Sequence, residues 1–224
     1  MTEFLVHDEP VSIPLDPITL EGDLSIPQGA TGIVVFAHGS GSSRHSPRNR
    51  FVAQYLQETG LATLLFDLLT QEEEEIDALT AHLRFDIDLL ATRLIAATDW
   101  LLQNPDTEGL NIGYFGASTG AAAALIAAVR RPDAVMTVVS RGGRPDLAKE
   151  DLADVKAPTL LIVGGWDTPV IEMNQSAMDR MKVRTEMMIV PGATHLFEEP
   201  GKLEEVAVMA GEWFAEHLNP GNGT

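Results

Sequence analysis

Short apolar runs alternate with longer segments of helical period along most of the chain. Residues 33–37 form a continuous apolar run, which is typical of a strand buried on both faces. Residues 86–102 repeat apolar side chains at steps of three and four, which predicts a helix with one buried stripe. By the same criteria we expect further strands at 62–66, 112–115, 135–140, 159–163 and 186–190, and further helices at 47–59, 119–130, 170–181 and 203–218.

Strands that alternate with helices predict an α/β fold, in which a mostly parallel central sheet is covered by helices on both faces. The chain before Gly32 differs, because 11–13 and 18–26 resemble two strands with no helix between them. We expect these strands to form an antiparallel N-terminal hairpin at one edge of the sheet. Residues 1–218 are predicted to form a single domain with a small insertion or lid around 68–85, followed by a flexible tail at 219–224.

The composition is that of a folded protein with a strongly acidic surface. Of the 224 residues, 45% are hydrophobic and 21% are charged, which is enough apolar material for a two-sided core. The net charge of −18 argues against binding to nucleic acid, whose phosphates require basic side chains, and against docking on anionic lipid. Solubility accounts for this charge, and so does adaptation to a salty environment.

Several kinds of chemistry and location are disfavoured by what the sequence lacks. The absence of cysteine removes disulfides, thiolate catalysis and cysteine-based zinc sites. The acidic first ten residues do not resemble a secretory signal, and no apolar run approaches the roughly 20 residues that span a bilayer. We therefore expect a soluble, cytoplasmic protein that is not bound to a membrane.

The most informative local pattern is G-x-S-x-G at residues 116–120, with Ser118 at its centre. In a chain rich in glycine this pattern also arises by chance, and the alternative is an ordinary turn between a strand and a helix. Its position between a buried strand and an alanine-rich helix favours a nucleophile elbow. Such an elbow holds the central residue in a strained turn with its side chain exposed, and the flanking glycines relieve the crowding. Ser118 is therefore the predicted nucleophile.

A serine hydroxyl needs a base to accept its proton and an acid to orient that base. His195 follows the predicted strand at 186–190 and is our candidate base, whereas His38, which ends an earlier strand, is expected to brace its own loop. Asp167 follows the strand between nucleophile and base and is our candidate acid, although capping the next helix is an alternative role. The order Ser118, Asp167, His195 along the chain is the order found in α/β-hydrolases.

The predicted oxyanion hole consists of two backbone N–H groups, because a tetrahedral intermediate needs two donors directed at its oxyanion. One donor is the N–H of Thr119, directly after the nucleophile. The other should come from the Gly- and Ser-rich loop after the strand at 33–37, where we nominate the N–H of Ser40, with Gly41 as the alternative.

Several side chains in loops around the same edge of the sheet are candidates for substrate binding. The basic candidates either hold an anionic group of the substrate or brace loops and carry surface charge; they are Arg44, His45, Arg141 and Arg144. Trp166 either lines the pocket or packs beneath its loop. The insertion carries the acidic run 72–75, which is either a solvated surface or part of a lid over the site.

The sequence resembles the dienelactone hydrolase-like branch of the α/β-hydrolases, and within it the small bacterial hydrolases that occur alone or fused to a phosphoribosyltransferase domain. The resemblance covers nearly the whole chain after Glu21 and rests on the segments HGSGSSRHSPRNRFVAQYL, LATLLFDLLT, HLRFDIDLL, IGYFGASTGAAAAL, VVSRGGRPDLA, PTLLIVGGWD and PGATHLFEEPG. It implies the α/β-hydrolase fold and a Ser–Asp–His hydrolase that carries no cofactor. Dienelactone hydrolases proper use a cysteine nucleophile, whereas position 118 is serine, so the dienelactone substrate does not follow from the resemblance.

We therefore expect hydrolysis of a small ester-like substrate through an acyl-enzyme intermediate, as in a carboxylesterase, with no metal or other cofactor. An acyltransferase or a thioesterase would use the same triad. The alternative from another class is a non-catalytic α/β-hydrolase scaffold that binds a ligand or partner. A metal hydrolase has less support because no HExxH pattern is present. The sequence leaves open whether the protein is a monomer or a homodimer.

Overall fold

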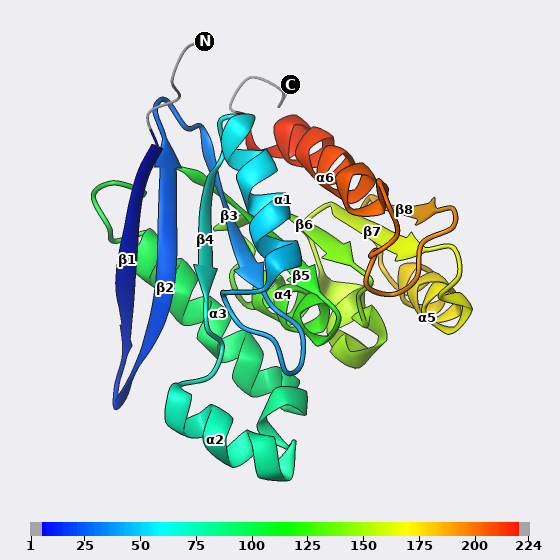
Figure 1. Ribbon diagram of the computed structural model, residues 1–224, viewed down its shortest axis with the longest axis horizontal. Helices are drawn as coiled ribbons and strands as arrows, with labels where there is room; N and C mark the ends of the chain where they lie inside the picture. The colour runs from blue at the N-terminus through cyan, green and yellow to red at the C-terminus, as the bar shows by residue number, and fades with distance from the viewer. Residues whose placement is uncertain (1–5, 220–224) are drawn as a thin grey trace.

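The computed structural model describes residues 6–219, which build an eight-stranded sheet in the order β1-β2-β4-β3-β5-β6-β7-β8 (Figure 1). β2 pairs antiparallel with β1 and β4, and the remaining neighbours, from β4–β3 to β7–β8, pair in parallel. The predicted mixed sheet with a hairpin at one edge is confirmed. The strands are β1 (Val6–Leu15), β2 (Ile18–Pro27), β3 (Gly32–Ala37), β4 (Ala62–Phe66), β5 (Asn111–Ala117), β6 (Val135–Arg141), β7 (Thr159–Gly164) and β8 (Thr185–Val190).

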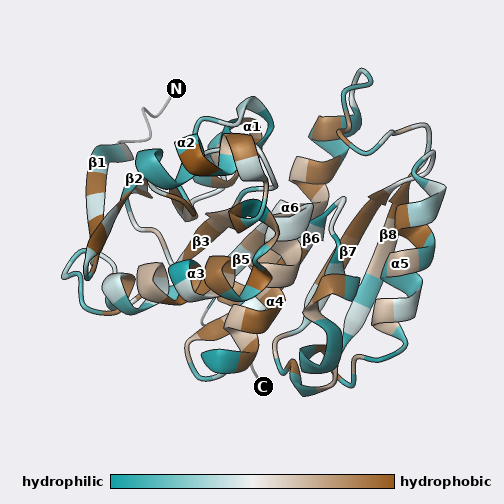
Figure 2. Cartoon of the chain, turned by 90° about the horizontal axis from the view of Figure 1, so that it is seen from below, coloured by the Kyte–Doolittle hydropathy of each residue, from teal (hydrophilic) through white to brown (hydrophobic). Residues whose placement is uncertain are grey.

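Helices cover both faces of this sheet (Figures 1 and 2). α1 and α6 pack together over one face, and α3, α4 and α5 cover the other. Figure 2 shows the hydrophobic strands in the interior between these two layers. The helices are α1 (Pro47–Glu58), α2 (Gln71–Thr80), α3 (Ile87–Leu101), α4 (Thr119–Arg130), α5 (Thr168–Met178) and α6 (Lys202–Leu218), with 3₁₀ segments η1 (Leu83–Phe85) and η2 (Pro145–Asp154).

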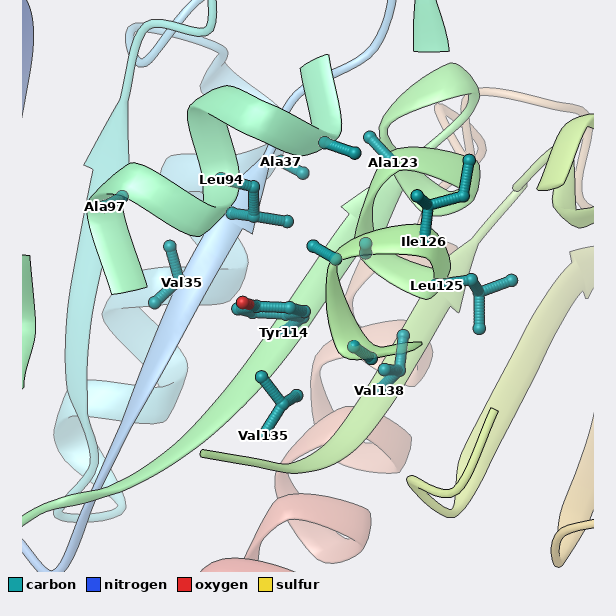
Figure 3. Close-up of a cluster of buried hydrophobic side chains, with 14 of the residues drawn as sticks. Val35, Ala37, Leu94, Ala97, Tyr114, Ala123, Leu125, Ile126, Val135 and Val138 are labelled. Atoms are coloured by element: carbon teal, nitrogen blue, oxygen red, sulfur yellow. The ribbon is translucent and has the colours of Figure 1, made fainter. Parts of the chain in front are cut away.

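The core on the α3/α4 side fixes the position of the helix that follows the predicted nucleophile. Tyr114 of β5 lies between α3 and α4 (Figure 3), and its hydroxyl is 2.5 Å from the hydroxyl of Thr98. Burial raises the pKa of Tyr114 well above its ordinary value. The alanines at 121–124 are all buried, so α4 approaches the sheet closely. The start of α4, where Ser118 lies, is thus held by a close-packed core.

Local sequence signals account for several boundaries. The side chain of Ser46 accepts a hydrogen bond from the N–H of Asn49, and Pro47 is the first residue of α1, as the Ser-Pro pair predicted. In α2, Thr70 and Glu73 form a reciprocal capping box, so the insertion contains a helix with a defined start. No helix within residues 6–219 is long and apolar enough to cross a membrane.

Several elements and boundaries differ from the expectation. α5 begins at Thr168 and not at residue 170, because Pro169 fits the first helical turn. η2 was not expected; its backbone is interrupted at Lys149, where φ is 49°. At the end of the chain Asn219 is hydrogen-bonded to Thr31 and to the backbone of α6, and the remainder of the predicted tail, 220–224, lies outside the described residues.

Candidate active site

Ser118 occupies a sharp turn between β5 and α4. Its backbone has φ 50° and ψ −120°, a conformation that costs an L residue of order 1–3 kcal/mol. Both glycines of the pattern are required by close approach of other backbone: a Cβ at Gly116 would lie 2.5 Å from Ala121 Cα, and one at Gly120 would lie 2.2 Å from the oxygen of Ala37. This is the geometry of a nucleophile elbow.

The His195 ring and the Asp167 carboxylate meet at the ends of two neighbouring strands. His195 Nδ1 lies 2.6 Å from Asp167 Oδ2, and the carboxylate is the more buried of the two groups. Asp167 precedes α5 but its side chain makes no capping hydrogen bond to that helix, so the alternative role of helix cap does not apply. The N–H of Trp166 donates to the carbonyl of Ala193, which ties the two loops together.

Ser118 and His195 line one pocket of about 210 Å³ at the carboxyl end of the parallel strands. In the described chain no hydrogen bond joins the Ser118 hydroxyl to the His195 ring; such contacts often tighten only when substrate binds. Asp167 lies behind the histidine and does not line the pocket. The lining residues are Gly39, Ser40, Ser42, Ser46, Arg48, Asn49, Ala117, Ser118, Arg141, His195 and Leu196.

The loop after β3 reaches the start of α4. The hydroxyls of Ser40 and Thr119 are 2.9 Å apart, and a Cβ at Gly39 would come within 3.0 Å of Ser118 Cβ. Within residues 6–219 neither the N–H of Ser40 nor that of Thr119 donates to another protein atom. Two free donors therefore lie on the two segments that flank the nucleophile.

His38 braces this loop from behind. Its Nδ1 donates to the carbonyl of Gly39 at 3.0 Å, and its Nε2 accepts from the N–H of Leu68 at 3.0 Å, so the ring is neutral and held in one tautomer. Burial, the largest cause, lowers the pKa of His38 below its ordinary value, while the Gly39 hydrogen bond and the charge of Asp67 oppose that shift.

The neutral state of His38 should make the protein less stable in acid. With its folded pKa below the ordinary 6.5, the unfolded chain takes up a proton below that pH that the folded chain does not. The stabilisation is fully present above about pH 6.5 and is lost below it, by at most about 1.4 kcal/mol per pH unit. At about pH 7 we expect the native protein to have a larger free energy of unfolding than His38→Gln. In urea titrations this difference should become smaller as the pH is lowered to about 5.5. A pH-independent difference would contradict a neutral buried ring.

Of the residues that the sequence suggested for substrate binding, one lines the pocket and the others lie outside it. Arg141 lines the pocket, whereas Arg44 is ion-paired with Asp67 and lies close to Asp23, outside the pocket. Trp166 is 67% exposed and does not line the pocket. The other two basic candidates are also engaged elsewhere, since His45 lies 2.7 Å from Arg50 and Arg144 makes a bidentate ion pair with Asp146.

The pocket also has lining residues that are not among the sequence candidates, and Arg48 and Asn49 are two of them. Arg48 and Asn49 belong to the first turn of α1, whose start had been placed correctly. The signal available in the sequence was their position directly after the Gly- and Ser-rich loop, which brings the start of α1 to the same edge of the sheet.

The insertion borders a second hollow of about 140 Å³, which shares Gly39, Ser40 and Ser42 of the loop after β3 with the first pocket. Its walls include Leu68, Leu69 and Leu90 from the core and Ala78 from α2. Asp77 of α2 is buried and accepts hydrogen bonds from the N–H groups that begin η1, so the insertion is folded back on itself. Ser118 does not reach this hollow.

The mixed sheet, the elbow after β5 and the order of the site residues define an α/β-hydrolase. The sequence model described as "Dienelactone hydrolase family" matches residues 20–217, and the chain belongs to that family. A crystal structure of a dienelactone hydrolase from Anabaena variabilis is 63% identical, with a TM-score of 0.94, covering 96% of this chain and 99% of that one.

Two further comparisons show how far the likeness extends. A Mycobacterium tuberculosis protein with the provisional name phosphoribosyl transferase is 57% identical over 213 residues, which are 95% of this chain but 47% of that protein, so the chain spans about half of its length. Est1E from Butyrivibrio proteoclasticus, also solved with ferulic acid bound, is 18% identical with a TM-score of 0.77, covering 92% of this chain and 98% of that one. At that identity the likeness shows the fold alone.

Proposed function

We propose that this protein is a serine hydrolase that cleaves a small carboxylic ester through an acyl-enzyme intermediate on Ser118. The observation that carries the proposal is the strained Ser118 in one pocket with His195, whose Nδ1 is 2.6 Å from Asp167. A residue held in such a conformation at a pocket is typical of a nucleophile. The name of the Anabaena relative, dienelactone hydrolase, supports the same bond type, because a lactone is a cyclic ester.

In this mechanism Ser118 Oγ attacks the ester carbonyl carbon while its proton moves to His195 Nε2. Asp167 accepts the hydrogen bond from Nδ1, which keeps Nε2 free as the base and stabilises the imidazolium that forms. The oxyanion of the tetrahedral intermediate accepts hydrogen bonds from the N–H groups of Thr119 and Ser40. Collapse breaks the bond to the alcohol, which leaves with the proton from Nε2.

The second half of the reaction repeats these steps with water. His195 Nε2 takes a proton from a water molecule whose oxygen attacks the acyl carbon. The second tetrahedral intermediate uses the same two N–H donors, and its collapse returns the proton to Ser118 Oγ and releases the acid. The mycobacterial relative is named for phosphoribosyl transfer over a length about twice that of this chain, and none of the roles proposed here depends on that activity.

Labelling with a fluorophosphonate probe tests the proposal directly, because only an activated serine reacts with it quickly. We expect the native protein to be labelled, with the adduct found by mass spectrometry on the peptide that contains Ser118. Ser118→Ala and His195→Ala should not be labelled, while Ser42→Ala, which changes another serine of the pocket, should be labelled like the native protein. Labelling of folded Ser118→Ala, or no labelling of folded native protein, would contradict the proposal.

A further inference from the structure

Arg141 is a buried cation without an anionic partner. It ends β6 next to the nucleophile strand and is only 7% exposed. Within residues 6–219 no carboxylate lies within 4 Å of the guanidinium, and the side chain makes one hydrogen bond, a long one of 3.4 Å from Nη2 to Asn49 Oδ1. Its Nε is buried and has no hydrogen-bond partner among the described residues. Because leaving a buried charge unpaired is costly, the donors of this guanidinium that no described protein group accepts favour an anionic group in the pocket.

A second buried arginine, Arg93, has the carboxylate partner that Arg141 lacks within residues 6–219, although its Nε is likewise without a hydrogen-bond partner there. Arg93 is 8% exposed, and its Nη2 lies 2.6 Å from the carboxylate of Glu73. The chain carries 33 acidic residues against 15 basic ones, so carboxylates are not scarce. The environment of Arg141 differs, because none of the described residues that line its pocket is acidic.

The pocket around Arg141 is locally positive. Arg48 lines the same pocket, and its charge adds to the larger effect of burial in lowering the pKa of Arg141 to about 10, which still leaves it protonated at neutral pH. Arg48 is itself paired at 3.1 Å with Glu198, which does not line the pocket. The negative charge elsewhere on the surface is screened beyond about 8 Å at physiological salt, so the local charge governs an ion inside the pocket.

The register of the sheet places Arg141 close to the proposed nucleophile. Arg141 pairs with Ala117, and the N–H of Ser118 donates to the Arg141 carbonyl at 3.3 Å. Arg141 and Ser118 line the same pocket of about 210 Å³. One small substrate could therefore contact the guanidinium and the serine at the same time.

We propose that Arg141, with Arg48 and Asn49 beside it, forms a subsite for an oxyanion group of the substrate, so that the preferred esters carry a carboxylate or a phosphate close to the scissile bond. This inference rests on the proposed hydrolase function and specifies its substrate class. The guanidinium fork matches either anion through paired N–H donors. Arg141 would position the anion and take no part in the proton transfers.

Paired esters test the subsite through kcat/KM. The probes are 4-nitrophenyl hemisuccinate, whose acyl chain ends in a carboxylate, and 4-nitrophenyl valerate, a neutral ester of similar length. In Arg141→Met we expect the preference for hemisuccinate over valerate to fall about 10- to 100-fold, mainly through KM, and Arg141→Lys to retain part of it. Arg144→Met, which removes an arginine outside the pocket, should leave the preference unchanged. Equal loss on both esters in Arg141→Met would overturn the proposal.

The melting temperature of Arg141→Met distinguishes a role in substrate binding from a role in stabilising the fold. Replacing an unpaired buried charge by a similar apolar side chain should not destabilise the fold, so Arg141→Met should melt no lower than the native protein. Arg93→Met, which leaves Glu73 without its partner, should melt lower. A lower melting temperature for Arg141→Met together with unchanged ester preference would show that Arg141 is a brace.

Anion binding is measured separately on Ser118→Ala, so that failure of the hydrolase proposal does not obscure the subsite. We expect succinate or inorganic phosphate to raise the melting temperature of Ser118→Ala, and not of the Ser118→Ala/Arg141→Met double variant. The stronger of the two ligands identifies the source of the anionic group. If neither ligand raises the melting temperature of Ser118→Ala, the subsite does not exist, whatever the labelling experiment shows.

Discussion

Replacing Asp167 by asparagine is expected to lower kcat for ester hydrolysis about 10⁴-fold while the fold is retained. Asp167 Oδ2 accepts from His195 Nδ1 at 2.6 Å, and this fixes the proton on Nδ1 and leaves Nε2 as the acceptor for the Ser118 proton. An asparagine amide presents N–H donors to the same ring nitrogen and so favours the tautomer with its proton on Nε2. That tautomer cannot take a proton from serine.

A matched control is available on the same helix. Asp167 precedes α5 and Asp179 follows it, and within residues 6–219 the Asp179 carboxylate accepts only from the side chain of Gln175 on the surface. Asp179→Asn should therefore leave kcat near the native value. Steady-state kinetics with a neutral 4-nitrophenyl ester, together with circular dichroism to verify folding, provides the measurement. A folded Asp167→Asn that keeps more than about a tenth of native kcat would remove Asp167 from the mechanism.

The elements with strong apolar periodicity were predictable almost to the residue. β4 and α4 have the bounds expected from the sequence, because a continuous apolar run and an alanine-rich stripe each admit one burial pattern. η2 was not predictable in this way. Its sequence is mainly polar, and the positive φ at Lys149 interrupts it, so its conformation depends on contacts with α4 and α5 and not on its own period.

The proposed catalytic residues could be predicted from the sequence because the requirements of the turn around Ser118 are local. An elbow requires glycines at fixed offsets from Ser118, and residues that follow parallel strands meet at one edge of the sheet. The substrate-binding residues were not accessible in the same way. Arg44 and Arg141 are the same residue type, and both were expected in loops at the same edge of the sheet. Only their neighbours distinguish them: Asp67 neutralises the first, and the second has no carboxylate within 4 Å among the described residues.

Gly120→Ala is expected to destabilise the protein by about 3 kcal/mol or more, which corresponds to a melting temperature roughly 6–12 °C lower for a chain of this size. A methyl group at this position would lie 2.2 Å from the oxygen of Ala37 and 2.6 Å from that of His38. Both are backbone atoms at the end of β3, so they cannot move aside as a flexible side chain would. Either α4 must shift away from the sheet or the loop that carries Ser40 must be displaced.

The loss of activity should therefore exceed the loss expected from unfolding alone, because both possible movements separate Ser118 from the N–H of Ser40. Gly109→Ala is the control: a methyl group there has no atom within 4 Å, and its φ is not in the left-handed region. That variant should melt within a few degrees of the native protein or slightly above it, since alanine restricts the unfolded chain. Thermal melts combined with ester hydrolysis well below both melting temperatures make the comparison. If Gly120→Ala has the melting temperature of the native protein, the close contact between α4 and the end of β3 does not require glycine at this position.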